Sequence, residues 1–278
     1  MNPTGSDMNI VVLVATHKKY RMPEDPLYLP VQVGAEIAID SQGLKKELGY
    51  QKDNTGDNIS SKNSEFSELT AIYWGWKNLD ADYIGLVHYR RYFSVRKKGK
   101  DPFDNVMTSA EAESILKSHP IIVPKKRKYF IETLESHYAD SLNDRHLLVT
   151  RDIVKEKYPA YLAAYDKVMK RTWGYMFNMM VMRRDYFDTY CQWVFDIVFE
   201  LENRIDISSY TSFEKRLFGR VSELLFDVWL DYQLDTGSLS AEQIQEVPII
   251  SMEPVNWFKK GSAFLAAKLF HKKYKKSF

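Results

Sequence analysis

Four residues with chemically active side chains directly follow an apolar run in the stretch DYIGLVHYRRYF, residues 82–93. They are His88, Tyr89, Arg90 and Arg91. The run at 83–87 has strand character, and open α/β sheets bind ligands outside the carboxyl ends of their strands. A planar guanidinium matches phosphate or carboxylate, so a diphosphate is a natural ligand for this pair of arginines. The alternatives are an ion pair with Asp57 or Glu68 and, for the histidine, a satisfied interior position.

A dense polar loop, TGDNISSKN at residues 55–63, stands directly before a predicted helix. Backbone amides at the start of that helix can hold an anion, and Asn58, Ser60 and Asn63 can donate to ribose or sugar hydroxyls. The alternative is a capping loop that stabilises only itself, which is the commoner use of these residue types. The loop lacks the glycine and lysine spacing of a P-loop, and no dinucleotide fingerprint follows the first predicted strand.

The segment GRVSELLFDVWL, residues 219–230, contains a carboxylate suited to acid–base chemistry. Glu223 follows Ser222, which is a candidate helix cap, and Arg220 is close by in the sequence. A carboxylate near a helix N-terminus stays ionised and can accept a proton from a sugar hydroxyl. The alternative is an acid that only stabilises the start of the helix.

Metal-binding patterns are weak in this sequence. No Asp-x-Asp follows an apolar run, and DAD at 80–82 precedes a predicted strand instead. His137 and His146 are too far apart for a compact ligand pair, and Cys191 lies on the buried face of a predicted helix. The sequence therefore predicts that cationic side chains rather than Mg²⁺ neutralise a bound diphosphate, with a divalent cation as the alternative.

The composition indicates a globular protein with a sizeable core, since 45% of the 278 residues are hydrophobic and 27% are charged. A net charge of +2 argues against nucleic acid as the partner. No apolar run approaches the ~20 residues of a membrane-spanning helix. A single cysteine and the lack of an N-terminal secretory pattern predict a cytoplasmic protein.

Strand and helix patterns succeed one another along the chain, which predicts an α/β fold in one domain at 9–256. Strands are expected at 9–15, 83–87, 121–124 and 247–250, and helices at 63–78, 185–204 and 221–232, with 131–170 mainly helical. Residues 257–278 form a tail without acidic residues, and its lysines lie between 259 and 276. A basic amphipathic helix on an anionic membrane surface is one interpretation, and a solvated or disordered tail is the other.

Two long strings, DNISSKNSEFSELTAIYWGWKN and DYIGLVHYRRYF, resemble a bacterial family of capsular and exopolysaccharide glycosyltransferases, long catalogued as a domain of unknown function. The resemblance extends through HPIIVPKKR, SHYADSLND and RLFGRVSELLFDVWL, and it covers residues 9–256. It implies a GT-A-like fold with a mostly parallel central sheet flanked by helices. It also implies inverting sugar transfer from a nucleotide-diphosphate donor to a lipid-linked oligosaccharide, at the inner face of the plasma membrane. UDP-sugars are the expected donors, with UDP-galactofuranose and UDP-galactose as candidates.

The resemblance also implies which residues border the donor. Thr16 and His17 are expected near the nucleotide base or ribose, and the pair Asn178 and Met179 is expected to face the sugar or the acceptor. The other residues expected beside the donor, some of them in the place of the metal motif of related folds, are Asp57, Asn58, Asn63, His88, Tyr89, Arg90 and Arg91.

On the acceptor side, His137 and Asp144 fall on positions that recur in the family. The rings of Trp173 and Tyr175 are expected to stack on sugars, since aromatic faces suit sugar rings; the alternative is a place in the core.

Glu223 matches a Ser-Glu-Arg pattern of the family, but Leu224 replaces the arginine. This departure weakens any phosphate-binding role of the segment and leaves Glu223 available as the base. The resulting hypothesis is an inverting, metal-independent transferase in which Arg90 and Arg91 stabilise the departing diphosphate.

Two other function classes stay open at this point. In a phosphodiester-cleaving enzyme, His88 and His17 act as acid and base beside the arginines, although no metal cluster or paired-histidine motif supports this. In a non-catalytic membrane-associated module, the basic tail and an aromatic surface recruit other assembly enzymes.

Overall fold

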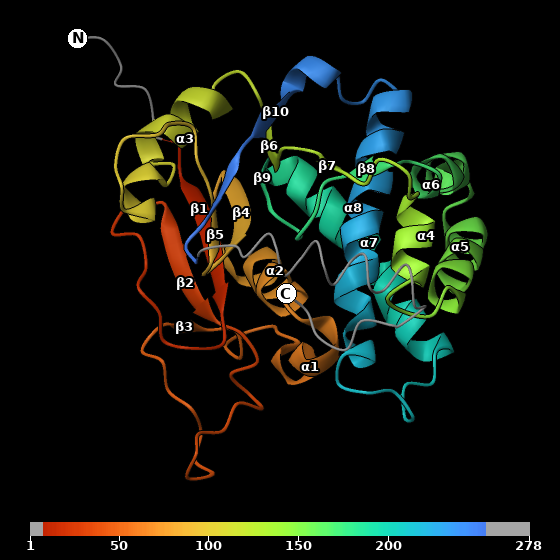
Figure 1. Ribbon diagram of the computed structural model, residues 1–278, viewed down its shortest axis with the longest axis horizontal. Helices are drawn as coiled ribbons and strands as arrows, with labels where there is room; N and C mark the ends of the chain where they lie inside the picture. Colours follow the sequence, from red (N-terminus) through yellow and green to blue (C-terminus); the bar gives the residue numbers. More distant parts are fainter. Residues whose placement is uncertain (1–7, 254–278) are drawn as a thin grey trace.

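A central sheet of nine strands organises residues 8–253, the part of the chain that the computed structural model describes (Figure 1). Eleven strands lie within these residues, nine of them in the central sheet: β1 (Ile10–Thr16), β2 (Tyr28–Gln32), β3 (Gln51–Lys52), β4 (Tyr83–His88), β5 (Arg91–Phe93), β6 (Ile121–Pro124), β7 (Arg127–Lys128), β8 (Trp173–Gly174), β9 (Met180–Arg183), β10 (Ile244–Val247) and β11 (Ile249–Ser251). Seven of them follow the order β10-β6-β9-β4-β1-β2-β3, while β5 pairs with β4 and with β11. The strands β7 and β8 form a separate pair. The tail at 257–278, with its lysines between 259 and 276, lies outside the described residues.

The sheet is mixed in direction. β1 pairs in parallel with β2 and β4, whereas β9 runs antiparallel to both of its neighbours, β4 and β6. The predicted α/β fold with a central sheet flanked by helices is confirmed. The late strand predicted at 247–250 is divided at Pro248, which has no backbone N–H to donate to a ladder, and its two parts join different neighbours.

Eight α-helices lie within the described residues. They are α1 (Asn63–Phe66), α2 (Leu69–Asn78), α3 (Ser109–Leu116), α4 (Leu134–Ala139), α5 (Arg145–Lys157), α6 (Leu162–Met169), α7 (Arg184–Arg204) and α8 (Leu217–Asp235). The helix predicted at 63–78 is broken at Ser67, whose φ is 54°, and the helix predicted at 221–232 begins one turn earlier than expected. In residues 8–253 we find no helix with both the length and the apolar character needed to cross a bilayer.

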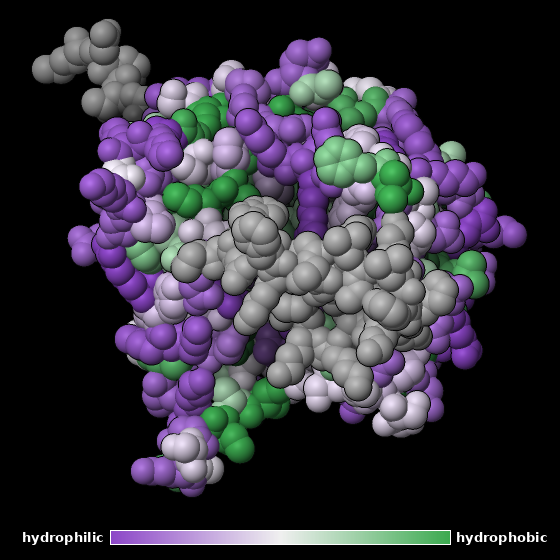
Figure 2. All heavy atoms as spheres, viewed as in Figure 1, coloured by the Kyte–Doolittle hydropathy of each residue, from purple (hydrophilic) through white to green (hydrophobic). Residues whose placement is uncertain are grey.

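The central strands are buried on both faces, as their unbroken apolar runs predict. On β1, Leu13 and Ala15 point into a core that includes residues of α2, α7 and α8, whereas Val12 and Val14 point into a second core that includes residues of α3. Figure 1 shows α4, α5 and α6 on the far side of α7 and α8 from the sheet. Where Figure 2 colours the surface by hydropathy, it is mostly hydrophilic, with small hydrophobic patches.

The residues after β4 form a tight hairpin. His88 pairs with Arg91 across the start of β5, so Tyr89 and Arg90 occupy a two-residue turn between them. Because β4 lies parallel to β1, with Ala15 opposite His88, this turn and the residues after β1 meet at the same edge of the sheet. The hairpin explains how one short stretch delivers four neighbouring polar side chains to one place.

Gly85 lets β9 approach β4 closely. A β-carbon at this position would lie 2.6 Å from the carbonyl oxygen of Met180 and 2.8 Å from Cγ2 of Val181. A backbone oxygen cannot rotate away, so a larger residue at position 85 must push the two strands apart. β9 begins two residues after Asn178, and its register on β4 therefore sets where Phe177 and Asn178 lie.

We expect Gly85→Ala to lower the free energy of unfolding by about 3 kcal/mol, at the upper end of the usual range for overpacking, because the clash is with backbone. The matched control is Gly237→Ala, where the added methyl group meets open space and only the positive φ of 72° is strained. That strain costs about 1 kcal/mol. Urea unfolding followed by circular dichroism measures both variants. Equal losses in the two variants would contradict the packing role of Gly85.

Candidate active site

A cavity of about 1010 Å³ opens where β1 and β4 end, and residues of α8 complete its wall. Its charged lining is predominantly cationic. The cations are Arg90, Arg91, Arg127, Lys128, Arg216 and Arg220, and the acids are Glu68, Glu132 and Glu223. Such a concentration of guanidinium groups in a concave site attracts an anionic ligand.

Half of the residues predicted from the sequence meet in this cavity. Those that line it are His17, Asn63, His88, Tyr89, Arg90, Arg91, His137 and Glu223. They come from segments far apart in the chain, which the sheet edge, α4 and α8 bring together.

The loop residues Asp57 and Asn58 do not line the cavity. Asp57 accepts a hydrogen bond from the hydroxyl of Tyr73 at 3.1 Å, and Asn58 donates to the carbonyl of Gly56 at 2.9 Å. Asn58 thus bonds within its own loop, whereas Asp57 bonds residues of α2, and neither side chain caps the helix that follows.

Six further predicted residues also lie outside the lining. They are Thr16, Asp144, Trp173, Tyr175, Asn178 and Met179. Asp144 is exposed at the start of α5, and Met179 is buried in the core. Trp173 lies under the Lys126 ammonium group, 4.4 Å from the ring centroid, and the buried Tyr175 donates its hydroxyl to Glu246 at 2.8 Å.

Phe177 has left-handed backbone geometry, with φ 76°, and contacts three of the cavity residues. Its N–H donates to Oε2 of Glu223 at 2.9 Å, and its carbonyl accepts a hydrogen bond from Nε2 of His88 at 2.7 Å. Its ring lies beneath the guanidinium of Arg91, at 4.4 Å. One strained residue thus holds a carboxylate, an imidazole and a guanidinium in fixed positions.

Asn178 is also left-handed, with φ 51°, and supports the cavity from behind rather than facing a ligand. Its side-chain amide donates to Glu68 at 2.8 Å and to the carbonyl of Gly219 at 3.1 Å, while its oxygen accepts from Ser222. The other non-glycine residues with positive φ among residues 8–253 are Ser67 and Phe130, and both line the cavity. Backbone strain of this kind clusters at functional sites.

The position of Glu223 corrects the prediction that it stays ionised at a helix start. It lies in the second turn of α8, and Ser222 beside it is buried inside the helix instead of capping it. Burial and the neighbouring Glu68 raise the pKa of Glu223 to about 7, against the opposing effect of the Phe177 N–H and Arg220. A carboxylate with such a pKa can both accept and release a proton near neutral pH.

The two histidines beside the arginines are poor proton donors at neutral pH. Burial lowers the pKa of His88, and because its Nε2 bonds a carbonyl oxygen, that nitrogen carries the proton of the neutral ring. Burial also lowers the pKa of His17, as do the charges of Lys18 and Lys46.

The two adjacent arginines have different surroundings. Arg90 forms an ion pair of 3.2 Å with Glu253, and both side chains are more than a third exposed, so this contact adds little stability. Arg91 makes no ion pair with a carboxylate within residues 8–253, and burial and the charge of Arg90 lower its pKa. An anion beside Arg91 would relieve this unfavourable charge.

Sequence reasoning did not identify Arg216, Glu68 or Arg127 as ligand-binding residues, and it treated Arg220 only as a neighbour of Glu223. Residues 216, 220 and 223 are spaced four and three apart, so they share one face of the helix. Arg216 donates to the hydroxyl of Ser67 at 3.0 Å. The spacing in RLFGRVSE was the available signal, but it does not reveal which face meets the sheet.

His137 and Glu132 form a hydrogen-bonded pair at the cavity wall. Nδ1 of His137 lies 3.1 Å from Oε2 of the buried Glu132, and the imidazole packs at a tilt against Tyr129 with the ring centroids 4.2 Å apart. Burial lowers the pKa of His137. The pair therefore presents an oriented neutral imidazole to the cavity.

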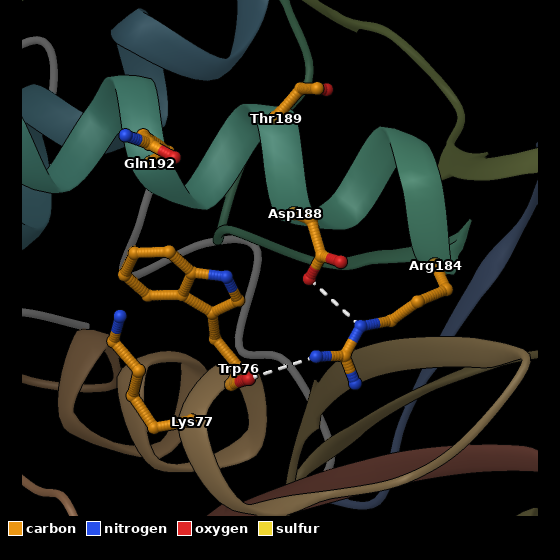
Figure 3. Close-up of a pocket in the computed structure, with 6 residues that line it drawn as sticks. All are labelled: Trp76, Lys77, Arg184, Asp188, Thr189 and Gln192. Atoms are coloured by element: carbon orange, nitrogen blue, oxygen red, sulfur yellow. Dashed lines mark hydrogen bonds and ion pairs between the residues drawn. The ribbon is translucent and has the colours of Figure 1, made fainter.

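A smaller hollow of about 390 Å³ lies between α2 and α7 (Figure 3). The residues that line it are Trp76, Lys77, Arg184, Asp188, Thr189 and Gln192. Arg184 pairs with Asp188 at 2.8 Å and donates to the carbonyl of Trp76, and Lys77 covers the indole ring at 3.4 Å. Since these polar groups bond one another, the larger cavity is the candidate site. In the described part of the chain, no three His, Cys, Asp or Glu side chains gather closely enough to bind a metal ion.

A solved structure described as the apo form of a WbbM bifunctional glycosyltransferase is similar to this chain, with a TM-score of 0.77 and 28% sequence identity. The similarity covers 88% of this chain and 46% of the other, so this chain spans about half the length of that protein. No protein of curated function is detectably similar. The family described as a domain of unknown function, DUF4422, matches residues 11–234, and the chain belongs to this family.

Proposed function

We propose that this chain is a glycosyltransferase that moves a sugar from a nucleotide-diphosphate donor to an acceptor hydroxyl. The observation that carries the proposal is the cavity at the ends of β1 and β4, where five arginines face three glutamates. The similarity to a bifunctional glycosyltransferase supports the same activity class. We further propose a UDP-sugar donor, with UDP-galactofuranose and UDP-galactose as candidates, and a lipid-linked oligosaccharide acceptor of capsular or exopolysaccharide synthesis.

In the proposed reaction, the acceptor oxygen forms a bond to the anomeric carbon while the bond from that carbon to the diphosphate breaks. The acceptor proton passes to Glu223, whose pKa near 7 suits a base. Arg91 and Arg90 stabilise the charge that develops on the leaving diphosphate. A single displacement of this kind inverts the configuration at the anomeric carbon.

The diphosphate is expected to bind without a divalent cation, because guanidinium groups already supply positive charge at the sheet edge. Arg216 and Arg220 extend this cationic wall along α8. The ring of His17 lies 5.4 Å from that of Tyr89 in the turn, and we expect the nucleoside here and the acceptor beside His137. The lysines between 259 and 276 are proposed to hold the protein at the inner face of the plasma membrane.

The phosphodiester-cleaving alternative is weaker. It requires His88 or His17 to donate a proton, yet burial lowers the pKa of both. Nε2 of His88 is also bonded to the carbonyl of Phe177. The third alternative, a non-catalytic module, gives no reason for a partly buried carboxylate in a cavity with five arginines.

A thermal-shift series with UDP, ADP and GDP, each with and without EDTA, tests the donor class and the metal-independent binding. A ligand that binds only the folded state adds about 2.7 kcal/mol of stability at a hundredfold excess over its Kd. We expect UDP to raise Tm selectively and EDTA to leave that rise unchanged. Loss of the rise with EDTA would contradict metal independence, and no rise with any nucleotide would contradict the proposed function.

Arg91→Ala is expected to weaken UDP binding by about 10–100-fold, since a hydrogen bond to a charged group contributes about 1.5–3 kcal/mol. The rate of sugar transfer should also fall, because removing a hydrogen-bond donor that stabilises developing charge raises the activation free energy by about 2.7–4 kcal/mol. Calorimetry and UDP release measure the two effects. The control is Arg183→Ala, which removes an arginine paired with Asp185 outside the cavity. Parent-like binding and transfer by the Arg91 variant would exclude the diphosphate role.

Glu223→Gln is expected to lower kcat by about 10²–10⁴, the usual contribution of a general base. In the parent, the base form of Glu223 appears as pH rises, so kcat/KM should increase with pH and level off above about 7. The variant should lack this rise. A variant with parent-like rates, or with the same pH profile at a lower rate, would show that another group takes the proton.

The same substitution, which should lower activity, is expected to raise stability relative to the parent at high pH. Because the folded pKa of about 7 exceeds the ordinary 4.5, ionising Glu223 destabilises the parent as pH rises between these values. The difference in unfolding free energy between Glu223→Gln and the parent should therefore be about 1–3 kcal/mol more favourable to the variant at pH 8 than at pH 4. Each pKa unit is worth about 1.4 kcal/mol. Urea unfolding at the two pH values measures the difference.

A further inference from the structure

The turn between β7 and α4 carries the two most exposed large hydrophobic side chains among residues 8–253. Phe130 is 82% exposed and Ile131 is 78% exposed, compared with 65% for Ile39, the next in order. Both also line the large cavity, so they stand at its mouth. We call these two residues the lip. Exposed apolar groups beside a binding site indicate a contact surface.

The lip is held in place on both sides. Before it, β7 pairs with β8, and the N–H of Tyr129 donates to the carbonyl of Thr172 at 2.7 Å. After it, the N–H of Leu134 donates to the carbonyl of Arg171 at 2.7 Å. Phe130 itself has a φ of 62°, a conformation that costs a residue with a side chain about 1–2 kcal/mol. The exposed side chains of Phe130 and Ile131 therefore stand on a turn that is fixed at both ends and strained at Phe130.

The segment before the lip, residues 125–128, carries four cationic side chains. Lys125, Arg127 and Lys128 are exposed, and none makes an ion pair with a carboxylate in the described residues. Lys126 between them pairs with Glu246 at 3.0 Å. Three open cations adjoin two apolar side chains, which is the combination that binds an anionic bilayer: apolar groups enter the headgroup region and cations meet the lipid phosphates.

We propose that the lip inserts into the headgroup region of an anionic membrane, with Lys125, Arg127 and Lys128 against the lipid charges. The mouth of the cavity then opens at the bilayer surface. A second copy of this chain is a poorer occupant, since symmetric contact would bring the same three cations against one another. This contact is separate from the tail at 259–276 and requires neither nucleotide binding nor sugar transfer.

Vesicle flotation of the full chain tests the contact, with phosphatidylglycerol–phosphatidylcholine vesicles compared with phosphatidylcholine alone. The double variant Phe130→Ser/Ile131→Ser should partition onto the anionic vesicles about tenfold more weakly, because two apolar side chains no longer leave water. The matched control is Ile39→Ser/Leu44→Ser, which removes two side chains that are 65% and 62% exposed at another place. It should bind as the parent does. Equal Tm values establish that both variants are folded.

A label at the lip distinguishes insertion from mere proximity. Cys191 is the single cysteine of the chain and is buried, so Ile131→Cys can be labelled selectively with an environment-sensitive fluorophore. Anionic vesicles should shift its emission to the blue, whereas a label at Leu44→Cys should not respond. Parent-like partitioning of the double variant, or a water-like spectrum of the label at 131 on bound protein, would overturn the proposal and leave the tail or another surface as the contact.

Discussion

The left-handed pair Phe177 and Asn178 is the constraint on which the geometry of the cavity depends. Through its N–H, its carbonyl and its ring, Phe177 holds Glu223, His88 and Arg91. Asn178 ties Glu68 to the same point. Two consecutive non-glycine residues with positive φ are strained, and they persist only where the surrounding structure fixes them. That surrounding structure is β9, whose close approach to β4 depends on Gly85.

This arrangement places acids and arginines together in a partly buried space, and each group changes the others. Burial and Glu68 raise the pKa of Glu223 to about 7, while Arg220 and Arg127 oppose the rise. Arg91 is partly buried next to Arg90 and lacks an ion pair with a carboxylate in the described residues. The site therefore contains a carboxylate able to exchange a proton and a guanidinium able to bind an anion, held by one residue.

Two parts of the cavity lining differ in character. One is the sheet edge, where the β4–β5 hairpin presents Tyr89 and Arg90 in a two-residue turn. The other is the mouth, which carries the lip, Phe130 and Ile131, beside three exposed cations. A cationic sheet edge and an apolar, basic mouth suit a transferase whose donor comes from water and whose acceptor is anchored in a membrane. The proposed function and the proposed membrane contact thus agree, although each has its own test.

The sequence alone determined the α/β class, because its elements leave local patterns. Strands buried on both faces, such as β1, β4 and β6, require continuous apolar runs, and a helix buried on one face, such as α7, requires an apolar residue every three or four positions. It also placed His88, Arg90, Arg91 and Glu223 at one site, partly through the family resemblance. Only the tertiary structure decided that α8 starts before Ser222, that Arg216 and Arg220 share the cavity wall, and that Asp57 bonds α2 and Asn58 its own loop outside the cavity. Those outcomes depend on which helix face meets the sheet and on backbone strain at Phe177, and neither leaves a local signal in the sequence.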